Sequence, residues 1–181
     1  DRLKPETVIC LGDSFHEAGA DQRMTGETRG RLAALCTAHQ WFWIAGNHDP
    51  DPPADLGGTC VESLAIGHLA FRHEPLPGPA TGEVCGHLHP CASVAVKGRS
   101  LRRRCFATDG ARLVMPSFGA YTGGLDVFEE AIAGLFPGGF GVWMVGRDRV
   151  RAIKGSRLSV PARLARDRTA GKMVTSAGKD R

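Results

Sequence analysis

Short apolar runs separated by turn-forming residues dominate the chain, with one longer periodic segment near its start. Thr7–Leu11 is apolar and precedes a glycine, which predicts a buried strand. From about Thr25 to His39, apolar residues recur at spacings of three and four, which predicts an amphipathic helix. Trp41–Ala45 predicts a second buried strand. The predicted order is therefore strand, loop, helix, strand, loop.

After the proline-rich stretch 50–53, the pattern changes to short β-like runs. These runs lie near Cys60–Leu64, Leu69–His73, Glu83–Cys85, Ala92–Lys97, Leu101–Ala107 and Leu113–Pro116. Asp126–Leu135 predicts a short helix, which a Pro-Gly pair ends. Val142–Val145 and Val150–Ile153 predict a closing hairpin. We therefore expect an α/β fold of two mixed β-sheets packed as a sandwich and flanked by helices.

Positive charge is concentrated at the C-terminal end of the chain. The formal net charge is +4, but residues 155–181 hold seven Lys or Arg and two Asp or Glu, which leaves residues 1–154 near neutral. The segment 155–181 also lacks apolar periodicity. We therefore predict one domain over residues 1–154 and a basic, disordered tail over 155–181. Such a tail could add salt-sensitive, non-specific affinity for nucleic acid.

Cysteine spacing and hydropathy indicate the compartment. The six cysteines form no CxxC pair and no zinc-finger spacing, and most lie inside apolar runs. They are Cys10, Cys36, Cys60, Cys85, Cys91 and Cys105. This usage predicts a reduced, cytoplasmic protein with cysteines in its core. No run approaches the roughly 18 apolar residues of a membrane helix, so we expect no membrane partner.

Six polar side chains fall at or just after the ends of predicted strands, where loops on a rigid scaffold present functional groups. They are Asp13, Asn47, His48, His73, His87 and His89. Glycines at 12, 46 and 86 precede three of them and would let the backbone approach a metal or phosphate closely. Carboxylate, amide and imidazole groups together suit Mn, Fe or Zn better than Ca or Mg alone.

The Gly-His-x-His motif suggests how the chain could bind two metal ions. In an extended backbone His87 and His89 would point to the same side, about 6.5 Å apart. Each could then bind one of two metals spaced roughly 3.5 to 4 Å apart. Taken singly, the motifs have plainer interpretations, because Gly-Asp and Gly-Asn are common turn signals and a lone histidine such as His73 is more often structural. Their combination and order favour a metal site.

From about Thr7 to Ile153 the motifs resemble those of the calcineurin-like metallophosphoesterases. The resemblance implies that Asp13 bridges two divalent metals, while Asn47, His73 and His87 complete one site and His89 binds the other ion. His48 would face the substrate and stabilise charge or protonate the leaving oxygen, with Asp49 fixing its tautomer. His16 would lie behind the ligands. The nucleophile would be a metal-bridging hydroxide that attacks phosphorus in line.

Longer phrases are similar to the ligase-associated DNA-damage-response endonucleases. They include Leu11-Gly-Asp-Ser-Phe-His16, Phe71-Arg-His-Glu-Pro75 and Pro116-Ser-Phe-Gly-Ala-Tyr121. This similarity implies a manganese-dependent hydrolase of DNA phosphodiesters in repair, with a DEXH-box helicase and an ATP-dependent DNA ligase as partners. Two alternatives stay open, a phosphoesterase of a small nucleotide and a non-catalytic component of a helicase–ligase assembly.

One superfamily motif is missing. No Asp-x-His occurs in the 181 residues, although the superfamily places it on the first strand, upstream of Gly12-Asp13. Without it the second metal keeps only Asp13 and His89, too few protein ligands for firm binding. We expect an upstream segment to supply the first strand and these ligands. The chain as given could therefore lack activity.

A basic run, Lys97–Arg104, has two interpretations. Arg102, Arg103 and Arg104 could contact DNA phosphates. Alternatively, the charges could mark the solvated edge of a strand, which is the commoner case. The sequence leaves both open.

Overall fold

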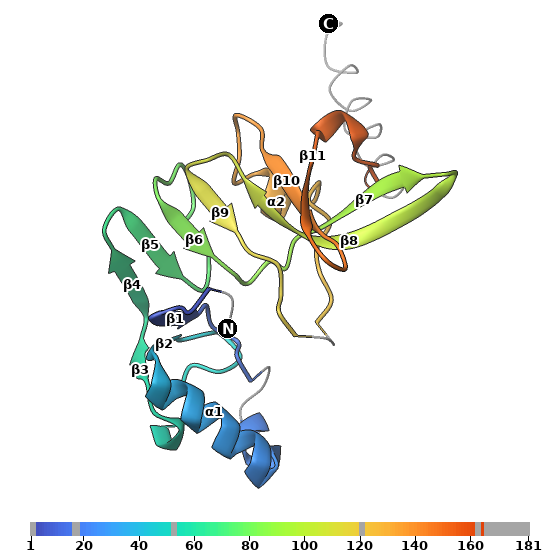
Figure 1. Ribbon diagram of the computed structural model, residues 1–181. Coiled ribbons are helices and arrows are strands. Elements are labelled where there is room, and N and C mark those ends of the chain that lie inside the picture. Colours follow the sequence, from blue (N-terminus) through green and yellow to red (C-terminus); the bar gives the residue numbers. More distant parts are fainter. Residues whose placement is uncertain (1–2, 16–18, 52–53, 120–121, 162–163, 165–181) are drawn as a thin grey trace, which may run out of the picture. The chain divides into compact units, whose positions relative to one another are not determined.

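The computed structural model describes residues 3–15, 19–51, 54–119, 122–161 and 164 (Figure 1). The chain divides into two compact units. The first comprises Asp1–His87 with Ala111–Leu113, and the second Leu88–Gly110 with Val114–Arg181. The single domain that the sequence predicts over residues 1–154 is thus divided between both units.

A three-stranded parallel sheet, in the order β1-β2-β3, carries the first two motif loops. Its strands are β1 (Thr7–Cys10), β2 (Gln40–Ile44) and β3 (Thr59–Val61). Parallel neighbours require a crossover, which helix α1 (Gly26–Ala38) provides between β1 and β2. The loops that follow β1 and β2 therefore leave the same edge of the sheet, and they carry Asp13 and Asn47.

Helix α1 begins and ends where the sequence predicts, but its predicted amphipathic character is wrong. Thr25 caps its N-terminus by accepting a hydrogen bond from the backbone N–H of Thr28 at 3.2 Å. Cys36 is the one buried residue of the helix, and Leu35 is 48% exposed. Cys36 packs near the Cα of Gly57, just after the 3-10 helix Ala54–Leu56. The helix therefore buries only part of its last turns.

The first unit also contains strands in the order β9-β6-β5-β4, with mixed directions. They are β4 (Ser63–Ile66), β5 (Leu69–Arg72), β6 (Glu83–Cys85) and β9 (Arg112–Val114). The predicted run Cys60–Leu64 is in fact divided between β3 and β4. Because β5 and β6 are parallel, the residues after them leave the same edge, and Gly86 N–H donates to the carbonyl of His73 at 2.9 Å.

A buried ionic cluster fixes the start of β6. The guanidinium of Arg112 donates to Glu83, and both side chains are almost fully buried. The other carboxylate oxygen of Glu83 lies 3.1 Å from Nε of Arg72 and accepts the backbone N–H of Leu76 at 3.0 Å. Arg112 also donates to the carbonyl of Leu76 at 2.7 Å. The cluster thereby ties β5, β6, β9 and the loop after His73 together.

Antiparallel strands form the second unit. They are β7 (Cys91–Val96), β8 (Arg99–Thr108), β10 (Gly141–Val145) and β11 (Val150–Ile153), with β8 paired to both β7 and β10. The helix predicted over Asp126–Leu135 is much shorter, because α2 spans only Glu130–Ala133. The first residues of the predicted helix pair with β7 instead. Asp126 forms a β-bridge with Cys91, and the N–H of Val127 donates to the carbonyl of Cys91.

Ordered structure continues into the segment predicted as a tail. A 3-10 turn spans Gly155–Arg157, Leu158 pairs with Val94, and the N–H of Ser159 donates to the carbonyl of Ser93 at 2.8 Å. The boundary predicted after residue 154 is therefore too early. Apart from residue 164, the remainder beyond 161 lies outside the described residues.

The two sheets and few helices confirm the predicted α/β fold. Among the described helices, none combines the length and apolar character that a bilayer crossing needs.

Candidate metal centre

The loop after β1 holds Asp13 in an unusual backbone conformation. Gly12 has φ +82° and Asp13 has φ +51°, both in the left-handed region that non-glycine residues rarely adopt. Gly12 also lies against the ring of His73, where a Cβ would come within 2.4 Å of Nδ1. The glycine predicted to allow close approach therefore does so, and the strain at Asp13 is typical of a functional loop.

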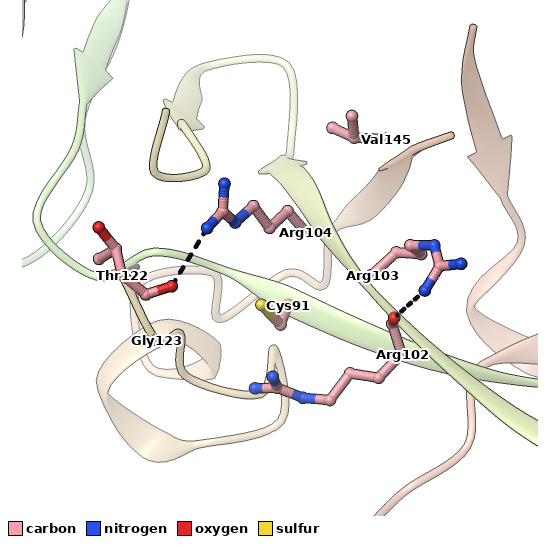
Figure 2. A pocket seen from close by; sticks show the side chains of 7 residues that line it. All are labelled: Cys91, Arg102, Arg103, Arg104, Thr122, Gly123 and Val145. Carbon is pink, nitrogen blue, oxygen red and sulfur yellow. Dashed lines mark hydrogen bonds between the residues drawn. The ribbon is translucent and has the colours of Figure 1, made fainter. Parts of the chain in front are cut away.

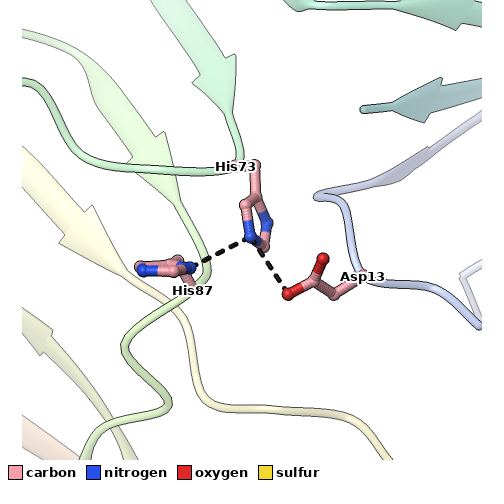
Figure 3. A group of neighbouring side chains, drawn as sticks. All are labelled: Asp13, His73 and His87. Carbon is pink, nitrogen blue, oxygen red and sulfur yellow. Dashed lines mark hydrogen bonds and ion pairs between the residues drawn. The ribbon is translucent and has the colours of Figure 1, made fainter. Parts of the chain in front are cut away.

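Three further groups of the first unit converge on Nε2 of His73. Oδ1 of Asn47 lies 2.8 Å away, Nδ1 of His87 3.1 Å and Oδ2 of Asp13 3.2 Å. Figure 3 shows the Asp13 carboxylate and the His87 ring turned toward His73 from separate loops. Among the described residues, Asp13, His73 and His87 form the one group of three or more His, Cys, Asp or Glu side chains that could hold a metal ion. Their ligand atoms all lie within 4.8 Å of one another.

Hydrogen bonding determines which nitrogen of His73 is available. Nδ1 lies 2.7 Å from the carbonyl oxygen of Leu11, which can only accept, so Nδ1 carries the proton. In the neutral ring Nε2 then presents a lone pair toward the Asp13 carboxylate, which is also an acceptor. His73 is 6% exposed, so water does little to relieve this contact. A cation between these atoms would resolve the conflict.

The spacing of these atoms also fits a shared ion. Ligand atoms about 2.1 Å from one metal lie roughly 3 Å from each other, which is the distance from His73 Nε2 to each of its three neighbours. The ligand atoms of Asp13, His73 and His87 all lie within 4.8 Å of one another. Two oxygens and two imidazole nitrogens match the mixed donor set of Mn, Fe or Zn. The residues present thus fit a divalent transition metal.

The Gly-Asn-His-Asp loop after β2 wraps around Asp13. The backbone N–H of His48 donates to Oδ1 of Asp13 at 2.9 Å, which leaves Oδ2 directed at His73. A Cβ on Gly46 would come within 2.2 Å of Asp13 Oδ1 and 2.6 Å of Asp49 Oδ1. His48 itself is exposed, as a residue that meets substrate must be.

Asp49 is placed differently from its predicted role beside the His48 ring. Its side chain is buried, and Oδ2 accepts the backbone N–H of Phe15 at 2.8 Å. Burial raises the pKa of the Asp49 carboxyl above its usual range, and the charge of Asp13 adds to this, whereas the bond from Phe15 opposes it. The contact with Phe15 shows that Asp49 pins the Asp13 loop.

The geometry expected of the Gly-His-x-His motif is wrong, because this segment is not extended. His87 has φ +61° and His89 has φ +48°, so the alternation of an extended strand does not apply. His87 belongs to the first unit, where its Nε2 lies 3.9 Å from Oε1 of Glu74. His89 belongs to the second unit, where its carbonyl packs against the Cα of Gly124.

Two partners of the centre were missed by the sequence interpretation. Glu74, which directly follows His73, offers the carboxylate that commonly orients a metal-binding imidazole. Leu11 acts through its backbone carbonyl, for which side-chain identity gives no signal. The predicted supporting residue His16 lies outside the described residues, and Arg102, Arg103 and Arg104 lie on β8 of the second unit.

One solved structure carries the comparison with known proteins. The crystal structure of Pseudomonas putida nuclease MPE is similar to this chain at 30% sequence identity and a TM-score of 0.64. The match covers 82% of this chain and 70% of that one. A scan against known protein families finds no match, and a search of curated proteins finds none either.

Proposed function

Because this chain belongs to the same family as the Pseudomonas putida nuclease MPE and shares its metallophosphoesterase fold, we propose that it is a metal-dependent phosphodiesterase that acts on DNA. The observation that carries the proposal is the convergence of Asp13, Asn47 and His87 on Nε2 of buried His73. Without a metal, the lone pair of Nε2 in the neutral His73 ring would face the carboxylate of Asp13, and two acceptors do not stabilise each other.

Four residues of the first unit would hold one ion, namely Asp13, Asn47, His73 and His87. A divalent ion held there would lower the pKa of water and offset charge on the phosphate under attack. The sequence assigns His89 to a second ion, and manganese is the proposed metal at both. The carbonyl of Leu11 orients the imidazole of His73 through a hydrogen bond, and the Glu74 carboxylate lies 3.9 Å from Nε2 of His87, where its charge favours a metal-binding imidazole.

His48 is proposed as the residue that meets the reacting phosphate. Its backbone is tied to Asp13, so the exposed ring is anchored at the edge of the ligand cluster. A neutral imidazole can hydrogen-bond the phosphate oxygens, and its protonated form can donate to the leaving oxygen. Asp49 is a positioning residue in this scheme, because it fixes the loop that carries Asp13.

The finer assignment is DNA repair beside a DEXH-box helicase and an ATP-dependent DNA ligase. It is supported by the phrases similar to the ligase-associated endonucleases, whereas the neighbour's description supports only a nuclease. A phosphoesterase of small nucleotides would use the same cluster, so substrate preference separates the two.

The test is hydrolysis of bis-p-nitrophenyl phosphate and of a fluorescent oligodeoxynucleotide, with and without Mn²⁺. We expect His48→Ala to lower kcat by about 10²- to 10⁴-fold, the usual contribution of a positioned acid or base. Mn²⁺ affinity should stay close to that of the wild type, because the ring is not assigned as a ligand. The matched control is His68→Ala, an exposed histidine in the turn before β5.

Two results would overturn parts of the proposal. Full turnover by His48→Ala would remove His48 from the mechanism while leaving the metal centre intact. Turnover of nucleotides with no cleavage of either diester would favour the small-molecule alternative.

A further inference from the structure

A pocket of about 380 Å³ lies within the second unit, and three of its seven lining residues are arginines (Figure 2). Its lining residues are Cys91, Arg102, Arg103, Arg104, Thr122, Gly123 and Val145. Arg102, Arg103 and Arg104 are consecutive on β8, opposite Ser93, Ala92 and Cys91 of β7. Side chains alternate between the two faces of a strand, so Arg102 and Arg104 lie on one face of β8 and Arg103 on the other. Two arginine side chains on the same face make the pocket positive, so it suits an anion.

Backbone carbonyls accept hydrogen bonds from two of these guanidinium groups. Arg102 Nη2 donates to the carbonyl of Gly124 at 2.6 Å, and Arg104 Nη2 donates to that of Thr122 at 3.2 Å. In the described part of the chain no carboxylate pairs with Arg102 or Arg103. The buried Asp126 bridges to Cys91 through the backbone, and its Oδ1 accepts the N–H of Phe128. Arg102 is therefore oriented by a neutral acceptor.

A fully exposed aromatic residue contacts Arg104 through its backbone carbonyl. Phe118 has 104% of its reference area exposed, an unusual setting for so large an apolar side chain. Arg104 Nη1 donates to its backbone carbonyl at 3.4 Å, so ring and guanidinium belong to one local structure. Aromatic faces beside cationic groups are the means by which proteins hold the bases and phosphates of nucleic acids.

The same loop also contacts a predicted metal ligand. A Cβ on Gly124 would come within 2.4 Å of the carbonyl oxygen of His89 and 2.5 Å of Sγ of Cys91. Arg102 is bonded to that same Gly124. Gly124 therefore contacts both the backbone of His89 and two residues that line the pocket, Cys91 and Arg102.

We propose that Arg102 and Arg104, with Phe118, whose carbonyl accepts from Arg104, form a subsite for a phosphate of the DNA chain that is not the one being cleaved. The proposal rests on the proposed function and adds a substrate-binding site outside the metal cluster. A solvated strand edge would not require guanidinium groups fixed around a cavity. The subsite would favour polynucleotides over small diesters, because only a polynucleotide carries a neighbouring phosphate and base.

The test compares two substrates in Arg102→Ala and Phe118→Ala. For the oligodeoxynucleotide we expect KM to rise about tenfold or more in Arg102→Ala, since a hydrogen bond to a charged group is lost. The dependence of binding on salt should weaken, with the log–log slope smaller by about 1. Turnover of bis-p-nitrophenyl phosphate should stay at the wild-type level in both variants. Arg102→Lys should recover part of the affinity.

Arg99→Ala is the matched control, because it removes the same charge from the same strand outside the pocket. Thermal melting of each variant shows that the fold is retained. Binding of the labelled oligodeoxynucleotide, followed by fluorescence anisotropy with EDTA present, tests the subsite without turnover. A wild-type protein that binds the oligodeoxynucleotide through Arg102 but hydrolyses nothing would refute the proposed function and keep the subsite.

Two outcomes would overturn the subsite. Equal oligodeoxynucleotide affinity and salt slope in Arg102→Ala, Arg99→Ala and the wild type would remove it. Loss of inorganic phosphate binding in Arg102→Ala, with oligodeoxynucleotide binding unchanged, would make the pocket a site for small anions.

Discussion

The imidazole of His73 lies against the α-carbon of Gly12, where a Cβ would sit 2.4 Å from Nδ1 and 2.6 Å from Cγ. The residue before this glycine, Leu11, accepts the hydrogen bond of Nδ1. The end of β1 therefore sets both the position and the tautomer of the histidine at the middle of the ligand cluster. A glycine is needed because no other residue leaves room for the ring.

Gly12→Ala should disrupt this fit. The added methyl group collides with the His73 ring, and φ of +82° is strained for any residue with a Cβ. We expect Mn²⁺ affinity to fall at least tenfold and the free energy of unfolding to fall by about 1 to 3 kcal/mol. Calorimetric titration with Mn²⁺ and urea unfolding measure the two effects. Gly98→Ala is the control, because its φ is +75° but nothing lies within 4 Å of its Cβ position. Equal Mn²⁺ affinity in both variants would contradict the predicted role of Gly12.

Binding of Mn²⁺ should stabilise the protein through His73. An ion that binds only the folded state adds about 2.7 kcal/mol at a concentration 100 times its Kd. Thermal melting with Mn²⁺ and with EDTA should therefore differ for the wild type and for His68→Ala, but not for His73→Ala. A full Mn²⁺-dependent shift in His73→Ala would place the ion elsewhere.

Sequence patterns identified the strands that deliver the centre and much of its chemistry. The apolar runs before Asp13 and Asn47 are β1 and β2, and their parallel pairing explains why residues 34 positions apart converge. Both runs were predicted as strands because a buried strand is continuously apolar. Only Trp43 and Ile44 of β2 are in fact buried, and β1 is partly buried throughout. The ligand role of these residues stays a prediction until a metal is measured.

The backbone conformation of the motif loops could not be predicted from the sequence. His87 and His89 adopt left-handed backbone, whereas the spacing of the motif suggested extended chain. Asp49 is next to His48 in sequence, yet it turns to the N–H of Phe15 because that donor closes the Asp13 loop. Helix α1 shows the same limit, since apolar spacing predicted a buried face, whereas the fold buries Cys36 fully and Leu32 and Ala33 only in part. Each outcome depends on tertiary partners that spacing does not encode.

Glu83→Gln should be among the most destabilising single changes in the first unit. It would leave the buried guanidinium of Arg112 facing a neutral group, and an uncompensated buried charge costs about 3 to 5 kcal/mol. Urea unfolding provides the measurement. Asp55→Asn breaks the exposed ion pair with Arg29 and should cost less than about 1 kcal/mol. A loss below about 1 kcal/mol in Glu83→Gln would show that Arg112 is held by the carbonyls of the loop after His73 alone.

Two buried thiols should make the folded state sensitive to alkali. Burial raises the pKa of Cys85 and of Cys105 to about 12, from 9.0 for an unperturbed cysteine. Below pH 9 both states keep the thiol protons, so these residues add no pH dependence. Between pH 9 and 12 the unfolded chain loses a proton that the folded chain retains, and the free energy of unfolding falls by up to about 1.4 kcal/mol per pH unit for each thiol.

Urea unfolding under reducing conditions, measured in steps from pH 8.5 upward, tests this prediction. The fall in the free energy of unfolding per pH unit should be smaller in Cys85→Ala and in Cys105→Ala than in the wild type. Each alanine also leaves a cavity, which lowers the free energy of unfolding by the same amount at every pH and therefore does not change the slope. In Cys60→Ala the change should be smaller, since Cys60 is exposed. Slopes identical to the wild type in both buried-cysteine variants would mean that these thiols ionise in the folded protein as readily as in the unfolded chain.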